Sequence, residues 1–148
     1  MRHESIDDVK AKIPELLEQV PYLKLLVLFG SRARGDNQAS SDWDFAMLFD
    51  EDLRQQYELR GGWDRYRSLT ILQSLLDLGD DEFDWVDLKN APAITAHCIA
   101  RDGVVLYENT EGCFESFRQT ALKSQAELKM YRQNVRAKVH DALERWRA

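Results

Sequence analysis

Residues 22–29 read YLKLLVLF and are apolar apart from Lys24. The run shows no sustained alternation of apolar and polar side chains, which indicates a strand buried on both faces. Gly30 and Ser31 end it, and a polar stretch leads into a second predicted strand, DWDFAMLF, over residues 42–49. Two buried strands therefore enclose a short polar segment near the start of the chain.

Helical and strand patterns alternate through the rest of the sequence. Residues 5–20 predict a helix with Ser5 as its N-cap, and Pro14 predicts that this helix either begins near it or kinks there. Gly61-Gly62 predicts a break between two helical pieces. The remaining predicted elements are a mainly helical segment over 54–78, a third strand over 81–88, a helix over 92–103, a fourth strand over 104–109, and one long helix from about Glu111 onward.

The chain has 148 residues, of which 44% are hydrophobic and 31% charged, as in an ordinary single globular domain. Its start is polar and acidic, unlike a signal peptide, and no apolar run has the length of a membrane-spanning helix. Cys98 and Cys113 lack metal-like spacing. One structural disulfide is the alternative, but we expect two buried free thiols in a reducing cytoplasm.

Charge is distributed unevenly along the chain. Residues 1–117 hold 12 Lys/Arg and 23 Asp/Glu, a net charge of −11, whereas residues 118–148 hold eight and three, a net charge of +5. The acidic body argues against broad nucleic-acid binding, which needs clustered cations. The basic tail is either a solvated helix face or a surface for an acidic partner.

Asp42 and Asp44 lie two residues apart on a predicted strand, so both carboxylates project from one face. Such a pair is destabilising unless a cation neutralises it or one carboxyl is protonated. Mg²⁺ suits this arrangement, because it binds a few carboxylates and completes its shell with water and substrate phosphates. The pair is therefore a candidate half-site for a metal–nucleotide complex.

The segment from Gly30 to Arg34 supplies groups that suit an anion. Gly30 lets backbone N–H groups approach a phosphate, and the Ser31 hydroxyl can donate to a phosphate oxygen. Arg32 and Arg34 add positive charge suited to bidentate contact. Each feature is commonplace alone, but together they join a phosphate cradle to a metal-binding pair.

A third carboxylate is needed to activate an attacking hydroxyl and share a metal. The third predicted strand offers Asp84 and Asp87, which lie on opposite faces of a regular strand, so only one can join Asp42 and Asp44. We favour Asp84, which stands at the start of its strand as Asp42 does, and interpret Asp87 as structural. His3, His97 and His140 are far apart in sequence and are also interpreted as structural.

A pattern of Gly-Ser, ten further residues and Asp-x-Asp occurs here as Gly30-Ser31 and Asp42-Trp43-Asp44. This pattern resembles the signature of the DNA-polymerase-β-like nucleotidyltransferases. The strings GSRARG and SDWDFAML, with FDWVDLKNAP and RDGVVLYE, are similar to the minimal nucleotidyltransferases of prokaryotes. The likeness spans roughly Tyr22 to Glu108. It implies an α/β (α+β) fold with a mixed sheet flanked by helices. We expect one domain over 1–148, with a catalytic core over 1–110 and a helical extension over 111–148.

The resemblance also implies the function. Asp42, Asp44 and Asp84 would bind Mg²⁺, with Asp84 as candidate general base, and Gly30 and Ser31 would hold the nucleoside triphosphate. Within this family, chains of this length often act as antitoxins, so we expect transfer of AMP from ATP to a tyrosine of a HEPN ribonuclease toxin. The alternatives are a small-molecule nucleotidyltransferase of the aminoglycoside-modifying kind and an antitoxin that acts by binding alone. Residues 55–68 match no pattern of the family, so the acceptor surface is not indicated.

Overall fold

A four-stranded sheet forms the centre of the molecule. The computed structural model describes residues 5–61 and 66–147. The strands are β1 (Leu23–Phe29), β2 (Trp43–Phe49), β3 (Phe83–Asp87) and β4 (Val104–Glu108), and they lie in the order β3-β2-β1-β4. β1 is antiparallel to both β2 and β4, whereas β2 and β3 are parallel. The predicted mixed sheet and its four strands are confirmed.

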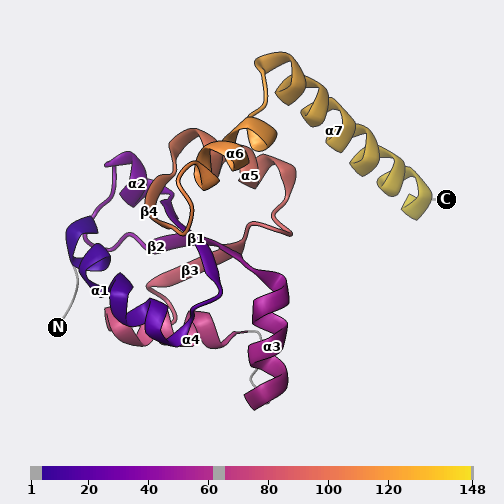
Figure 1. Cartoon of the computed structure of the whole chain (residues 1–148). Coiled ribbons are helices and arrows are strands. Elements are labelled where there is room, and N and C mark those ends of the chain that lie inside the picture. The colour runs from indigo at the N-terminus through magenta and orange to yellow at the C-terminus, as the bar shows by residue number, and fades with distance from the viewer. Residues whose placement is uncertain (1–4, 62–65, 148) are drawn as a thin grey trace.

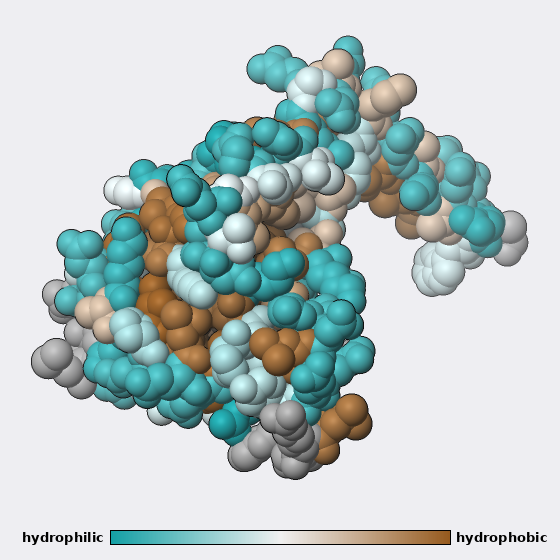
Figure 2. Space-filling model, in the orientation of Figure 1, coloured by the Kyte–Doolittle hydropathy of each residue, from teal (hydrophilic) through white to brown (hydrophobic). Residues whose placement is uncertain are grey.

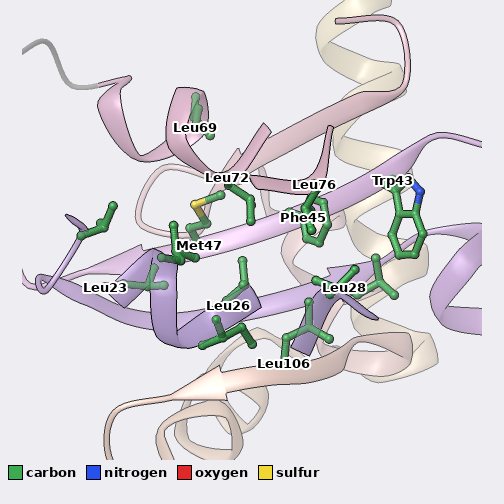
Figure 3. Close-up of a cluster of buried hydrophobic side chains, with 14 of the residues drawn as sticks. Leu23, Leu26, Leu28, Trp43, Phe45, Met47, Leu69, Leu72, Leu76 and Leu106 are labelled. Carbon is green, nitrogen blue, oxygen red and sulfur yellow. The ribbon is translucent and has the colours of Figure 1, made fainter. Parts of the chain in front are cut away.

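Helices cover both faces of this sheet (Figure 1). α1 (Ile6–Gln19) and α4 (Arg67–Leu76) pack on one face, and α5 (Ala93–Asp102) and α6 (Cys113–Ala121) pack on the other. Figure 3 shows leucines of α4 pointing toward Phe45 and Met47 of β2. The inner residues of β1, Leu25 to Leu28, have no exposed surface, so the strand is buried on both faces as its sequence predicts.

The first helix begins at its predicted cap and runs through Pro14. The Ser5 hydroxyl accepts from the Asp8 N–H at 3.1 Å, and the Asp8 carboxylate accepts from the Ser5 N–H at 3.3 Å, which is a capping box. Pro14 leaves the carbonyl of Lys10 without its helical donor. Both residues are exposed, so water can take that donor's place, and the helix does not have to begin at Pro14.

The segment between β2 and β3 forms two helices, as predicted. α3 (Glu51–Gly61) begins three residues before the predicted helical segment, and α4 begins at Arg67. The predicted break includes Gly62, which lies outside the described residues. Arg54 anchors α3, since its guanidinium lies 4.4 Å from the centre of the Phe49 ring and pairs with Glu58 at 3.3 Å. α3 then extends away from the sheet (Figure 1).

The prediction of one continuous helix from Glu111 is wrong. Residues 122–124 separate α6 from α7 (Gln125–Arg147). The backbone of Leu122 is extended, and the Lys123 N–H donates to Nδ1 of the buried His97 at 3.0 Å. Ser124 and Glu127 then form a new capping box, with bonds of 3.1 and 3.2 Å. The Ser-x-x-Glu pattern was a sequence signal for this second start.

α6 and α7 differ in their packing. Phe114 and Phe117 of α6 pack against the sheet, whereas α7 has no buried residue and leaves the body of the molecule (Figure 1). Among the helices that the structure describes, none has both the length and the apolar character needed to cross a membrane.

Candidate active site

The end of β1 brings the backbone against Asp44. Gly30 has φ 75° and ψ −157°, a conformation that is essentially restricted to glycine. A Cβ atom at this position would collide with the Asp44 carboxylate. The preceding residue, Phe29, is the register partner of Asp44 across the β1–β2 pair. Gly30 therefore lets the chain turn directly over the second aspartate.

Ser31 follows as the first residue of α2 (Ser31–Arg34), a single helical turn. The Ser31 carbonyl accepts from the backbone N–H groups of Gly35 and Asp36 at 3.0 and 3.2 Å. These bonds hold the turn at the end of β1. Of the two predicted phosphate-binding residues, Gly30 lies against Asp44 and Ser31 follows it in the chain. Their contact with a nucleotide stays a prediction.

The three predicted carboxylates come from adjacent strands. Asp44 and Asp84 are register partners in the parallel β2–β3 pair, so their side chains project from the same face of the sheet. Asp42 lies one residue before β2. Asp87 pairs with Met47 instead, lies on the opposite face from Asp84, and accepts from the Lys89 N–H at 3.0 Å. The geometry therefore brings Asp84, rather than Asp87, to the pair.

Burial and like charges raise the pKa of Asp44 from 3.8 to about 6. Burial is the largest cause, and the negative charges of Asp84 and Asp42 act in the same direction. Arg34 and Arg32 oppose the shift in the pKa. Ionisation of the Asp44 carboxyl therefore costs free energy in the folded protein, as expected beside a cation-binding position.

The donor atoms fit Mg²⁺, although the carboxylates do not by themselves form a closed metal site. Within residues 5–61 and 66–147, no three Asp, Glu, His or Cys side chains are grouped closely enough to hold a metal ion. One carboxylate oxygen of Asp84, Oδ1, accepts from the Trp85 N–H at 2.8 Å. An all-oxygen donor set that needs water and phosphate to complete it is the kind that Mg²⁺ prefers.

Arg32 has a contact that the sequence did not predict. Its guanidinium donates to the Ser41 carbonyl at 2.9 and 3.1 Å and to the Ala39 carbonyl at 3.4 Å. It also lies 4.3 Å from the centre of the ring of Trp43, which is buried in the core. Arg32 thus ties α2 to the segment that leads directly into Asp42.

Arg34 makes a different contact, with Asp36, at 3.2 Å on the surface. Both arginines remain close enough to Asp44 to lower its pKa. Binding of phosphate by either arginine stays a prediction. No sequence signal identified the carbonyl groups that Arg32 binds, because the contact depends on how the loop folds back.

The model of the family described as polymerase beta, nucleotidyltransferase, matches residues 11–112, more than half of the chain. With the sheet and the aspartates placed as above, this chain belongs to the polymerase beta nucleotidyltransferase family. The resemblance found in the sequence is confirmed, and the match extends beyond residues 22–108 on both sides.

Individual proteins that are similar to this chain have more specific descriptions than the family model. The chain is 40% identical over 131 residues to the protein adenylyltransferase MntA of Aphanizomenon flos-aquae (strain 2012/KM1/D3), covering 88% of this chain and 87% of that protein. A solved toxin–antitoxin structure with AMP-PNP matches at 26% identity and a TM-score of 0.57, over 94% of this chain and 98% of the other.

A further solved structure shows the same fold. It contains a tri-AMPylated HEPN toxin of Shewanella oneidensis in complex with an MNT antitoxin. The match has 24% identity and a TM-score of 0.54, over 97% of this chain and 99% of the other.

Proposed function

We propose that this chain is an antitoxin adenylyltransferase. It transfers AMP from ATP to a tyrosine hydroxyl of a cognate HEPN ribonuclease toxin and so neutralises the toxin. The observation that carries the proposal is the placement of Gly30 directly over Asp44, with Asp84 as the strand partner of Asp44. The support from similarity is the 40% identity to a protein adenylyltransferase over 88% of the chain.

The reaction is an in-line displacement at the α-phosphorus of ATP. A bond forms between the acceptor oxygen and the α-phosphorus, the bond to the bridging oxygen of the β-phosphate breaks, and pyrophosphate leaves. Such a transfer needs little covalent participation by the protein, so positioning and electrostatics supply the rate. The absence of a side chain at Gly30 lets the backbone lie directly against Asp44, beside the proposed position of the triphosphate.

Each residue has a proposed role in this displacement. The Ser31 hydroxyl donates to a phosphate oxygen, and Arg34 adds a positive charge near it. Asp84 is the candidate general base that accepts the proton of the acceptor hydroxyl. Mg²⁺ held by Asp42, Asp44 and Asp84 would offset the charge that develops on the phosphate and lower the pKa of that hydroxyl.

The same proposal includes a cytoplasmic location. ATP is the substrate, and Cys98 and Cys113, both partly buried, are free thiols. Free thiols are expected in a reducing compartment. The protein is therefore expected to act where its ribonuclease partner would meet RNA.

Intact-mass spectrometry of the toxin after incubation with this protein, ATP and Mg²⁺ tests the proposal. The expected result is a gain of one or more AMP units that Asp44→Asn and Asp84→Asn abolish. Asp87→Asn is the matched control, because Asp87 lies on the same strand as Asp84 but on the opposite face. A neutralised toxin of unchanged mass would instead support an antitoxin that acts by binding alone. Transfer of AMP to a small molecule but not to the toxin would support the aminoglycoside type.

A further inference from the structure

The long helix α7 is a regular element of the described structure, but it does not cover any other part of it. It spans residues 125–147, and none of its residues is buried. Figure 1 shows it leaving the body at an angle, and Figure 2 shows apolar side chains among the hydrophilic ones along it. A helix that stands alone gains no stability from packing, so an exposed apolar face on it requires an explanation.

Six apolar residues of α7 form one stripe. They follow one another at spacings of three and four, which places them on one face of a helix. Val135, Val139 and Trp146 are 42%, 54% and 84% exposed. A face with anchors at this spacing is the type that lies in an apolar groove of a partner. The α7 stripe consists of Leu128, Tyr131, Val135, Val139, Ala142 and Trp146.

Basic side chains border the α7 stripe on both sides. Arg132 and Arg136 follow its residues on one edge, each within three or four positions of a stripe residue. Lys138 and Arg145 lie on the other edge. Of the three acidic residues in the helix, Glu127 is bonded to Ser124. Asp141 and Glu144 lie away from the stripe, and Glu144 is 3.9 Å from His140. The stripe therefore fits an apolar groove with acidic borders.

The junction before α7 is specifically held, so the helix is not a loose tail. Nδ1 of His97, a residue only 5% exposed, accepts from the Lys123 N–H, and the Ser124–Glu127 capping box starts the helix. Arg118 ties α6 to α5 through a bond of 2.9 Å to the Ala100 carbonyl. These bonds fix where α7 departs from the catalytic body.

We propose that the α7 stripe is the docking surface for the toxin, in an acid-bordered apolar groove of that protein; this rests on the proposed function. The family match ends at residue 112. The toxin–antitoxin chain solved with AMP-PNP covers 94% of this chain, which leaves 6% of 148, about nine residues, unmatched. Most of the 23-residue α7 is therefore shared with that chain, beyond what the nucleotidyltransferase family requires.

Charge disfavours pairing of α7 with a second α7. Another copy would present the same basic borders, so the two sets of arginines and lysines would repel one another. A toxin held by α7 instead keeps its acceptor hydroxyl at a high effective concentration near the aspartates. Docking and chemistry then reside on separate parts of one chain.

The test compares single substitutions on opposite faces of α7. Val139→Asp and Trp146→Asp change the stripe, and Met130→Asp adds the same charge on the other face at a residue that is 64% exposed. We expect the stripe variants to raise the KM for the toxin by roughly tenfold or more, with little change in kcat, since anchor residues dominate interface affinity. ATP binding and helix content should match those of the wild type, and Met130→Asp should retain the wild-type KM.

A wild-type KM in both stripe variants would overturn the proposal, as would an equal effect of Met130→Asp. So would a stripe-dependent dimer of this chain alone that binds the toxin normally, because the occupant would then be a second copy. Affinity for the toxin measured without ATP separates this proposal from the chemistry. Stripe-dependent binding without AMP transfer sustains the docking surface and overturns the proposed function. AMP transfer that does not depend on the stripe sustains the proposed function and overturns the docking surface.

Discussion

Asp44 of β2 and Asp84 of β3 are register partners in a parallel pair of strands, on the face of the sheet toward which the Gly30 turn closes. Parallel pairing aligns the strands in the same direction, so the two carboxylates lie near the same edge although they are 40 positions apart in the sequence. Burial, together with the repulsion between their charges, raises the pKa of Asp44 to about 6. The site is thus destabilising in the absence of a cation.

The first prediction follows from that shift in pKa. A carboxyl with a higher pKa in the folded state than in the unfolded state binds more protons when folded, so its contribution to stability falls as the pH rises from about 4 to about 6. Asp44→Asn should therefore raise the free energy of unfolding by ~1–2 kcal/mol at pH 8, a value reduced for partial solvent screening. The gain should be close to zero at pH 4.

Urea denaturation of the wild type and Asp44→Asn at these two pH values measures the difference. The same variant should lose AMP transfer, which would separate stability from activity. Asp87→Asn, on the opposite face of β3, should show neither effect. Destabilisation by Asp44→Asn at pH 8 would mean that this carboxylate is already compensated in the folded protein.

The second prediction concerns Mg²⁺. A cation that binds the ionised carboxylates stabilises the folded state by mass action, and it competes with the proton on Asp44. Adding Mg²⁺ to protein first treated with a chelator should raise the Tm more at pH 8 than at pH 5. Differential scanning calorimetry measures this, with Asp42→Asn/Asp44→Asn as the variant in which the shift should vanish. An equal shift in that variant would place the ion elsewhere.

The sequence predicts much of this architecture because its signals are local. The apolar run in β1, the Gly30-Ser31 turn and the spacing of Asp42 and Asp44 each lie within one short segment. The end of α6 at Ala121 was missed, because it depends on the bond from Lys123 to the distant His97. The contact of Arg32 with the Ser41 carbonyl was also missed, since the loop that supplies this carbonyl has no regular pattern.

The third prediction compares substitutions at two glycines. It distinguishes the effect of a steric collision with Asp44 from the effect of backbone strain alone. Gly30 and Gly35 have φ of 75° and 83°, and both disfavour a side chain. A Cβ at Gly30 would displace the Asp44 carboxylate, whereas a Cβ at Gly35 has no neighbour within 4 Å. Gly30→Ala should therefore abolish AMP transfer and lower the free energy of unfolding by about 3 kcal/mol, and Gly35→Ala should lower it by about 1 kcal/mol.

Chemical denaturation and a transfer assay on both variants test this difference. Gly35→Ala should retain most of its activity at a temperature well below its Tm. Equal activity losses in the two variants would show that strain in the turn, rather than displacement of Asp44, accounts for the effect.

The last prediction distinguishes two roles for Arg32. If its main role is to hold the segment before Asp42, the planar guanidinium is required, because it bonds to two carbonyls and stacks on Trp43. Arg32→Lys should then behave like Arg32→Ala, with kcat reduced roughly tenfold or more and the Tm lowered, since a small misplacement of Asp42 slows the chemistry. If Arg32 instead binds phosphate through its charge, Arg32→Lys should retain most of the activity, and Arg32→Ala should mainly raise the KM for ATP. Steady-state kinetics with ATP as the varied substrate, together with thermal unfolding, resolves the two roles, because only the first links the loss of kcat to a loss of stability.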